Sequence, residues 1–488
     1  MQANGQVVHL RGGYYPIVYD RKASSGGEQI DDMKGAQDAL MASRGMASVY
    51  KGHLKSRAKK VDAGRPLTLT LRGLFEGFND AIHDVCWDEW VGNTRRILQS
   101  DGAFDRAIRD YWGADADRAV KQWHRDIATR GEGSKVYGDT LANVLRSHVS
   151  LVGVGFNLVT AAIQPLAITQ TAAVLGGKWT AKGIGEFLAM GPKKASQFAA
   201  SKSRVMADRA RTQFREIAEV QVMAAGNISQ LASKFMRAAY FPIVMAQMLV
   251  DIPTWLGAYN KALSEGQTDS DAVAIADRTL QDAQGSGNLS ELSGIERGNA
   301  WSKLFTVYYT FFNTALQIAM VSGHTKGKLA AARDIMLVLM IQPIAETFLR
   351  EALKVGGDDG EDSDEYWKRM GLAAAGNVAE FNMGLFVGLR EAGAMVKGLV
   401  TGDYEQYRGP TALRKITDTT SFLTSIRKDI ENGELDERTI RQAITVMAEW
   451  TGWPIPIVPV TRAIKGHTAL EEGKTDNEFA YLLGYSDY

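Results

Sequence analysis

The sequence predicts an all-α protein, a multi-helix bundle of long helices preceded by an irregular N-terminal arm. From Leu67 onward, apolar residues recur with the 3.6-residue period of a helix. Strand-like alternation is scarce, because Leu67–Leu71 is the only clear case and is short. Hydrophobic residues make up 45% of the chain and charged residues 23%, which indicates a globular protein rather than a disordered one. Long helices also allow the bundle to be elongated.

Two segments show the helical period most clearly. Apolar residues of the first fall on one helix face, namely Leu74, Phe78, Ala81, Ile82 and Val85. The second repeats this spacing in Ala272, Val273, Ala276, Thr279, Leu280 and Ala283. Thr268 or Ser270 is its candidate N-cap, and Gly285 just beyond its end is typical of a helix C-terminus.

Composition shifts divide the chain into five regions. They are an irregular basic arm at 1–66, a helical domain at 67–148, a helical core with uncharged apolar helices at 149–355, an acidic linker at 356–366 and a C-terminal helical region at 367–488. The linker contains six carboxylates within eight residues from Asp358, so we expect a solvated loop. Its spacing does not fit a calcium-binding EF-hand loop.

Several apolar segments are long enough to concern a membrane. Residues 149–177 and 304–323 contain no charged side chain, whereas 238–250 is shorter and includes Pro242. Amides and prolines make these segments poor spans, so three interpretations stay open: buried core helices, constitutive spans, or helices that fold in a soluble bundle and later meet a bilayer. The candidate membrane-interacting residues are Leu151, Phe156, Leu158, Ile163, Phe305, Tyr308, Phe312 and Leu316.

Charge and cysteine usage limit the possible classes. Lys plus Arg and Asp plus Glu both number 56, so overall charge gives no argument for nucleic-acid binding. The single cysteine, Cys86, excludes an internal disulfide framework and a cysteine-based zinc site, and we expect it to be a buried thiol. No signal peptide is visible at the N-terminus.

The sequence carries no convincing catalytic motif. Glu76, Asp80, His83 and Asp84 form a polar stripe on one predicted helix, but the Glu-x-x-His motifs of a di-iron bundle are missing. Glycine-lysine loops near 176–178 and 323–328 lack the spacing of a phosphate-binding loop. We therefore predict a non-enzymatic protein without catalytic residues, metal or cofactor. An enzyme-associated module, lytic or nucleic-acid-modifying, is the alternative that the stripe would support.

One stretch is locally basic, with only Asp208 as an interruption. On a helix it would present a positive face, either simply solvated or in contact with DNA or anionic lipid. The candidate residues are Lys193, Lys194, Lys202, Arg204, Arg209, Arg211 and Arg215.

An ordered series of short motifs resembles the C-terminal conserved region of the large polyvalent proteins of tailed phages. The longest match is Ile252–Leu263, followed by Ala276–Arg278 and Gln284–Gly287. The other matching motifs are Gly13–Asp20, Gly64–Leu67, Ile82–Asp84, Gln164–Leu166 and the aromatic run Leu304–Phe312. The resemblance covers roughly residues 10–345 and leaves the last part of the chain unassigned. Within it, we expect Trp255 to pack on Tyr259 and Asp277 to pair with Arg278.

The resemblance implies an internal virion protein that is packaged in the capsid and enters the host envelope with the DNA. The implied partners are copies of the same chain, other internal or portal proteins, packaged DNA and the host inner membrane. Enzymatic modules of the longer relatives do not carry over to these motifs. An integral membrane protein is the remaining alternative, because the apolar segments alone do not separate it from an ejection protein.

Overall fold

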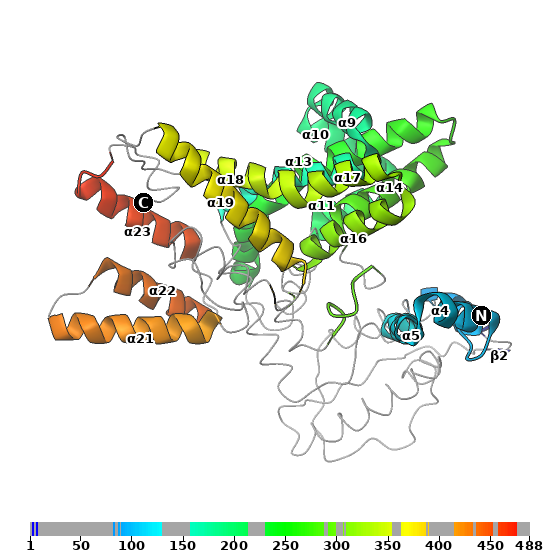
Figure 1. Ribbon diagram of the computed structural model, residues 1–488, viewed down its shortest axis with the longest axis horizontal. Helices are drawn as coiled ribbons and strands as arrows, with labels where there is room; N and C mark the ends of the chain where they lie inside the picture. The colour runs from blue at the N-terminus through cyan, green and yellow to red at the C-terminus, as the bar shows by residue number, and fades with distance from the viewer. Residues whose placement is uncertain are drawn as a thin grey trace, which may run out of the picture. The chain divides into compact units, whose positions relative to one another are not determined.

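The computed structural model describes residues 2–3, 6–7, 82, 86–87, 89–128, 157–212, 230–286, 291–298, 306, 309–353, 363–386, 389, 414–432, 436–451 and 457–475. These residues are almost entirely helical, which confirms the all-α prediction (Figure 1). Strand is limited within them to the antiparallel pair β1 (Gln2–Ala3) and β2 (Gln6–Val7). The chain forms two compact units: unit 1 is Met1–Asp139 with Arg297–Asn299, and unit 2 is Thr140–Glu296 with Ala300–Tyr488.

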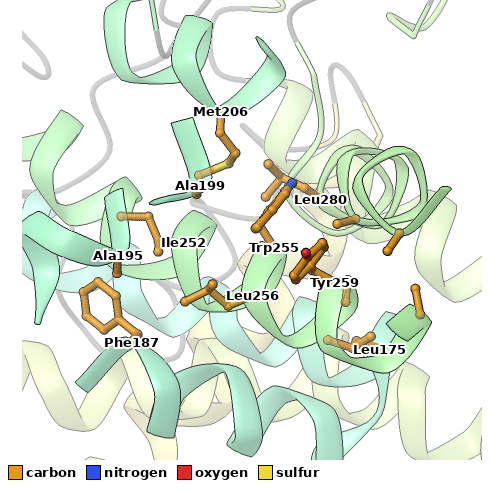
Figure 2. Close-up of a cluster of buried hydrophobic side chains, with 14 of the residues drawn as sticks. Leu175, Phe187, Ala195, Ala199, Met206, Ile252, Trp255, Leu256, Tyr259 and Leu280 are labelled. Atoms are coloured by element: carbon orange, nitrogen blue, oxygen red, sulfur yellow. The ribbon is translucent and has the colours of Figure 1, made fainter. Parts of the chain in front are cut away.

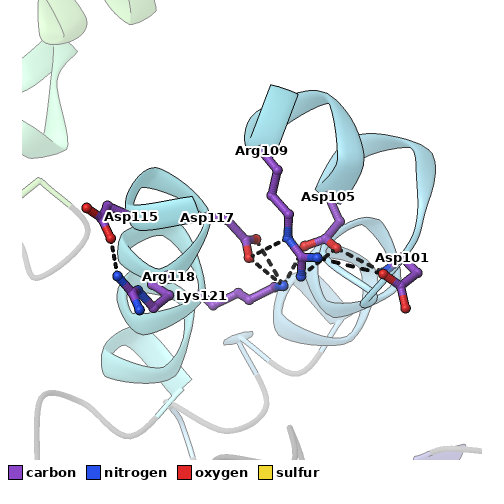
Figure 3. A network of polar contacts seen from close by, with 7 residues as sticks. All are labelled: Asp101, Asp105, Arg109, Asp115, Asp117, Arg118 and Lys121. Carbon is purple, nitrogen blue, oxygen red and sulfur yellow. Dashed lines mark hydrogen bonds and ion pairs between the residues drawn. The ribbon is translucent and has the colours of Figure 1, made fainter. Parts of the chain in front are cut away.

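Unit 1 contains α4 (Ala103–Trp112) and α5 (Ala114–Ala128), which are joined at Gly113 and held together by buried charges. Lys121 of α5 donates to Asp105 of α4 at 2.5 Å and to Asp117 at 3.0 Å (Figure 3). Arg109 contacts the same two carboxylates at 3.1 and 3.2 Å. Two cations thus neutralise two buried carboxylates between neighbouring helices.

Cys86 is exposed, so the prediction of a buried thiol is wrong. The packed face of this helical segment carries Trp90 and Val91, and Trp90 contacts the rings of Trp87 and Trp123 at 5.3 and 5.5 Å. Cys86 lies seven residues, about two turns, before Asn93, which is exposed on the same side of the helix.

In unit 2, the helices after residue 157 are short and separated by sharp breaks. They are α7 (Leu158–Ile163), the 3₁₀ turn η1 (Gln164–Ala167), α8 (Ile168–Leu175), α9 (Gly177–Met190), α10 (Pro192–Lys202) and α11 (Arg204–Thr212). Gly176 and Gly191 stand at two of the breaks with φ of 89° and 76°, values that glycine adopts without steric cost.

The central helix of unit 2 is α13 (Gln230–Ser264), which runs through both Pro242 and Pro253. The segment at 238–250 is therefore part of a longer helix than its proline suggested. Next comes α14 (Asp269–Gln284), where Thr268 accepts a hydrogen bond from the Asp271 amide and Gly285 follows with φ of 68°. Both predicted cap positions of this helix are confirmed.

The rest of unit 2 is also helical. Its elements are α16 (Tyr309–Thr325), α17 (Lys328–Met336), the π-helical turn η2 (Leu337–Ile341), α18 (Gln342–Ala352), α19 (Ser363–Gly384), α21 (Arg414–Asn432), α22 (Glu437–Thr451) and α23 (Ile457–Glu471). The last residues of the acidic run, Asp364 and Glu365, lie in the first turn of α19 rather than in a loop. Carboxylates there interact favourably with the helix dipole.

A hydrophobic cluster joins α8 to α11 with α13 and α14 around Trp255 (Figure 2). The Trp255 and Tyr259 rings stack at 5.0 Å, as predicted from their spacing. The expected pair between Asp277 and Arg278 is wrong. Asp277 accepts hydrogen bonds from Trp255 and Ser203, whereas Arg278 pairs with Asp282 one turn later, because adjacent helical residues point in different directions.

Two glycines bring α9 and α13 into backbone contact. A Cβ added at Gly183 would lie 2.1 Å from the carbonyl oxygen of Pro253, and one at Gly257 would lie 2.5 Å from that of Trp179. Neither position has room for a side chain. This contact fixes where α9 lies along α13.

Candidate functional site

Polar side chains from five helices meet inside the apolar core of unit 2. We call this set the polar seam: Gln170 and Thr171 of α8, Gln247, Asp251 and Thr254 of α13, Gln284 of α14, Gln342 of α18 and Arg209 of α11. Five of them belong to α8 and α13, which contribute to the two described helical stretches that are long and apolar enough to cross a membrane. The seam is therefore the place where polar groups inside apolar helices find partners.

The middle of the polar seam is a directed chain of hydrogen bonds. Gln284 Nε2 donates to Thr171 Oγ1 at 3.0 Å, and the Thr171 and Thr254 Oγ atoms lie 2.6 Å apart. Thr254 in turn donates to the Val250 carbonyl at 2.7 Å, so the shared proton comes from Thr171. Both threonine hydroxyls in this series have hydrogen-bond partners, which removes most of the free-energy cost of burying them.

On one side, the polar seam continues to α18. Gln170 Nε2 and Thr169 Oγ1 both donate to Gln342 Oε1, at 3.3 and 3.2 Å. Gln170 is 1% exposed, so its amide has no access to water. The contact joins α8 to a residue 172 positions later in the chain, on α18.

At its other side, the polar seam ends in a poorly satisfied charge pair. Gln247 donates to Asp251 Oδ1 at 2.9 Å, and Arg209 Nε lies 3.7 Å from Asp251 Oδ2. Neither Asp251 Oδ2 nor Arg209 Nη1 has a hydrogen-bond partner, although both are buried. Burial raises the pKa of Asp251, and Arg209 and Gln247 only partly oppose this.

Two helical stretches of the described chain are long and apolar enough to cross a membrane. Leu158–Leu175 comprises α7, η1 and α8, and one third of it is buried; Ala238–Ser264 is most of α13, and 72% of its apolar window is buried. The core helix of a soluble bundle satisfies the same criteria. The polar seam contacts both stretches, so it fastens the two apolar helices to one another.

The candidate membrane-interacting residues are only partly described. Leu158 is exposed, Ile163 is half-buried, and Phe312 and Leu316 pack against a second hydrophobic cluster that includes Phe381. The remaining four lie outside the described residues: Leu151, Phe156, Phe305 and Tyr308. Phe312 is thus part of the core, where it contacts Phe381 at 5.4 Å.

The basic candidates do not all belong to one positive face. They are divided between α10 and α11, which break at Ser203. Lys193, Lys194 and Arg204 are exposed, but Lys202 pairs with Asp269 at 2.8 Å. Arg209 points inward to Asp251 and to the Gly285 carbonyl, so its assignment to a solvent-facing patch is wrong. Arg215 lies outside the described residues, and Arg211 is described only as part of α11.

The polar stripe of Glu76, Asp80, His83 and Asp84 lies outside the described residues. Within the described part of the chain, no group of three His, Cys, Asp or Glu side chains is arranged to hold a metal ion. The hydroxyls and amides of the polar seam donate to and accept from one another, which suits helix packing.

No family model, curated protein or solved structure matches this chain.

Proposed function

We propose that this chain is a structural, non-enzymatic internal protein of a tailed-phage virion, which enters the host envelope with the genome and assists its passage. The observation that carries the proposal is the polar seam between two apolar helices. Leu158–Leu175 and Ala238–Ser264 meet the length and composition of membrane spans, yet their polar groups are paired inside the bundle. Such a chain can be carried in water and still offer apolar helices to a bilayer.

Two further features support the transfer of α8 and α13 from the bundle into a bilayer. Helix α13 contains two internal prolines, and proline is more frequent in membrane helices than in soluble ones. The hydrogen bonds of the polar seam link neutral groups, except at Asp251 and Arg209, so little charge has to be separated when α8 and α13 part. The resemblance to phage polyvalent proteins supplies the virion context and the partners: further copies of the chain, other internal or portal proteins, DNA and the inner membrane.

Mass spectrometry of purified virions tests the first half of the proposal. We expect the chain to be present in intact particles and depleted from particles that have ejected their DNA. Its absence from intact particles would contradict a virion role.

A reversible crosslink across the polar seam tests the second half. The Thr171 and Thr254 Oγ atoms lie 2.6 Å apart, close to a disulfide bond length of about 2.0 Å, so Thr171→Cys with Thr254→Cys should crosslink α8 to α13. The exposed Cys86 is first changed to Ser to prevent mispairing. We expect the reduced protein to become resistant to carbonate extraction from bacterial-lipid vesicles and the oxidised protein to remain extractable.

Two outcomes would contradict the insertion step. One is equal carbonate resistance of the oxidised and reduced forms, because separation of the helices would then be unnecessary. The other is complete extraction of both forms, which would leave α13 as an ordinary buried core helix. If the protein already resists carbonate extraction from the membranes of the expressing cells, before any vesicles are added, an integral membrane protein is favoured instead.

A further inference from the structure

We infer that the exposed side of α9, α10 and the first residue of α11 docks on the anionic headgroups of a lipid bilayer. We call this surface the cationic face and define it by Lys178, Lys182, Lys193, Lys194 and Arg204, together with the apolar Leu188. The inference rests on the proposed function and names the lipid chemistry at which the apolar helices would be delivered.

Charge is the first argument. Residues 177–204 contain six Lys or Arg and one acid, Glu186, although the whole chain has a net charge of zero. Glu186 accepts a hydrogen bond from Asn260 of α13. None of the five cations of the cationic face pairs with a carboxylate in the described part of the chain, whereas nearby Lys202 does. The structure therefore leaves this positive charge for an external anion.

The positions of the lysines within their helices are the second argument. Lys178 lies in the first turn of α9, and Lys193 and Lys194 lie in the first turn of α10, with no acidic residue in either turn. The helix dipole makes the N-terminal end partly positive, so cations there are unfavourable. An anionic partner offsets this cost at both helix starts at once.

Apolar and aromatic groups favour a bilayer over nucleic acid. Leu188 is 70% exposed and belongs to the same helix as Lys178 and Lys182. The Trp179 ring lies 5.1 Å from both lysine Nζ atoms and packs against the hydrophobic cluster, so it is not free to stack on a base. Lysine and tryptophan directly after an apolar helix are typical of the membrane boundary, and α8 ends at Leu175.

Vesicle flotation with the full chain tests the inference. The probes are vesicles of phosphatidylcholine alone and of equal parts phosphatidylcholine and phosphatidylglycerol. The test variant is Lys182→Gln, Lys193→Gln and Lys194→Gln. The control variant is Lys328→Gln, Lys368→Gln and Lys428→Gln, which removes the same charge from exposed lysines of α17, α19 and α21. Circular dichroism melting curves establish that both variants are folded.

We expect the wild type and the control to bind only the anionic vesicles. The test variant should bind roughly 100-fold more weakly, because each lysine near an anionic surface contributes a factor of about five. Binding should also weaken with added salt. The inference is overturned if the test variant binds as well as the control, or if it loses affinity for duplex DNA while its binding to vesicles is unchanged.

The same samples separate this inference from the proposed function. Salt-reversible binding that depends on the three lysines, without carbonate resistance, supports the docking surface and contradicts insertion. Carbonate resistance that is equal in the test and control variants supports insertion and overturns the docking surface.

Discussion

The polar seam of unit 2 and the charge network of unit 1 bury polar groups in opposite ways. In unit 1, Lys121 and Arg109 each contact both Asp105 and Asp117, on two helices that follow one another in the chain. In the polar seam of unit 2, mostly neutral side chains pair between helices up to 173 residues apart, and the seam's one charge pair is 3.7 Å long. Local charge pairs hold a hairpin closed, whereas distant neutral pairs hold helices that can separate at a lower electrostatic cost.

The substitution expected to destabilise unit 2 most is Trp255→Ala. Trp255 is fully buried, stacks on Tyr259 and donates to Asp277, so its loss should cost about 3–5 kcal/mol of unfolding free energy. Hydrogen exchange measured peptide by peptide should show faster exchange in α13 and α14 but not in α4 and α5. Trp367→Ala removes an exposed tryptophan and should change little, and equal effects of the two variants would contradict this packing.

Lys121→Met tests the charge network of unit 1. Without the ammonium group, the buried Asp105 and Asp117 share only Arg109, so like charges repel in a confined space. We expect faster exchange throughout α4 and α5 and a larger loss of stability than removal of any single seam hydroxyl causes. Arg118→Met removes the cation of the exposed pair with Asp115 and is the control, because surface pairs contribute little. Exchange in unit 2 should not change.

A double-mutant cycle at Thr171 and Thr254 measures how strongly these two residues of the polar seam are coupled. Either single change to Val leaves a buried hydroxyl without its partner, so each should cost about 1–3 kcal/mol. The double variant should cost clearly less than the sum, because both hydroxyls are removed together. It should also insert more readily into vesicles than the wild type. Additive losses from chemical denaturation would mean that the two residues act independently.

The smallest expected effect is that the stabilities of unit 2 and unit 1 depend on pH with opposite signs. The pKa of Asp251 is raised by burial, so its contribution is fully present below 3.8 and is lost as the pH rises through the raised value. The pKa of Asp105 is lowered, chiefly by the hydrogen bond from Lys121, so its contribution is lost as the pH falls below 3.8. Mild acid should therefore slow exchange in α13 and leave unit 1 unchanged, while strong acid should destabilise unit 1. Asp251→Asn should abolish the mild-acid response.

Local features of the fold could be predicted from the sequence. The caps of α14 and the stacking of Trp255 on Tyr259 depend on residues within one turn of each other, and both predictions are confirmed. The pair of Asp277 with Arg278 failed because neighbouring helical side chains diverge. The prediction of a buried Cys86 failed because burial depends on where a partner helix packs, and a single helix does not show that.

The polar seam could not be predicted, because helical periodicity carries no information on partners far away in the sequence. Thr171 meets Thr254 across 83 residues, and Gln170 meets Gln342 across 172. A signal was nevertheless present, since Gln170, Gln247 and Asp251 interrupt otherwise apolar segments. Such residues need buried partners, but only the fold identifies them. Arg209 was misplaced for the same reason, because its partner Asp251 lies on another helix.

The glycine contact between α9 and α13 has a consequence for the depth of Lys182 in a bilayer. From Ala238 to Gly257, α13 has 20 residues, which is roughly 30 Å of helix and matches the thickness of a bilayer's hydrocarbon core. Gly183 touches α13 at the far end of that length, beside Lys182. In the proposed insertion, with Ala238 at one boundary of the bilayer, this contact would hold Lys182 level with the opposite boundary. The proposal thus assigns to two glycines the depth at which a positive charge would meet the membrane.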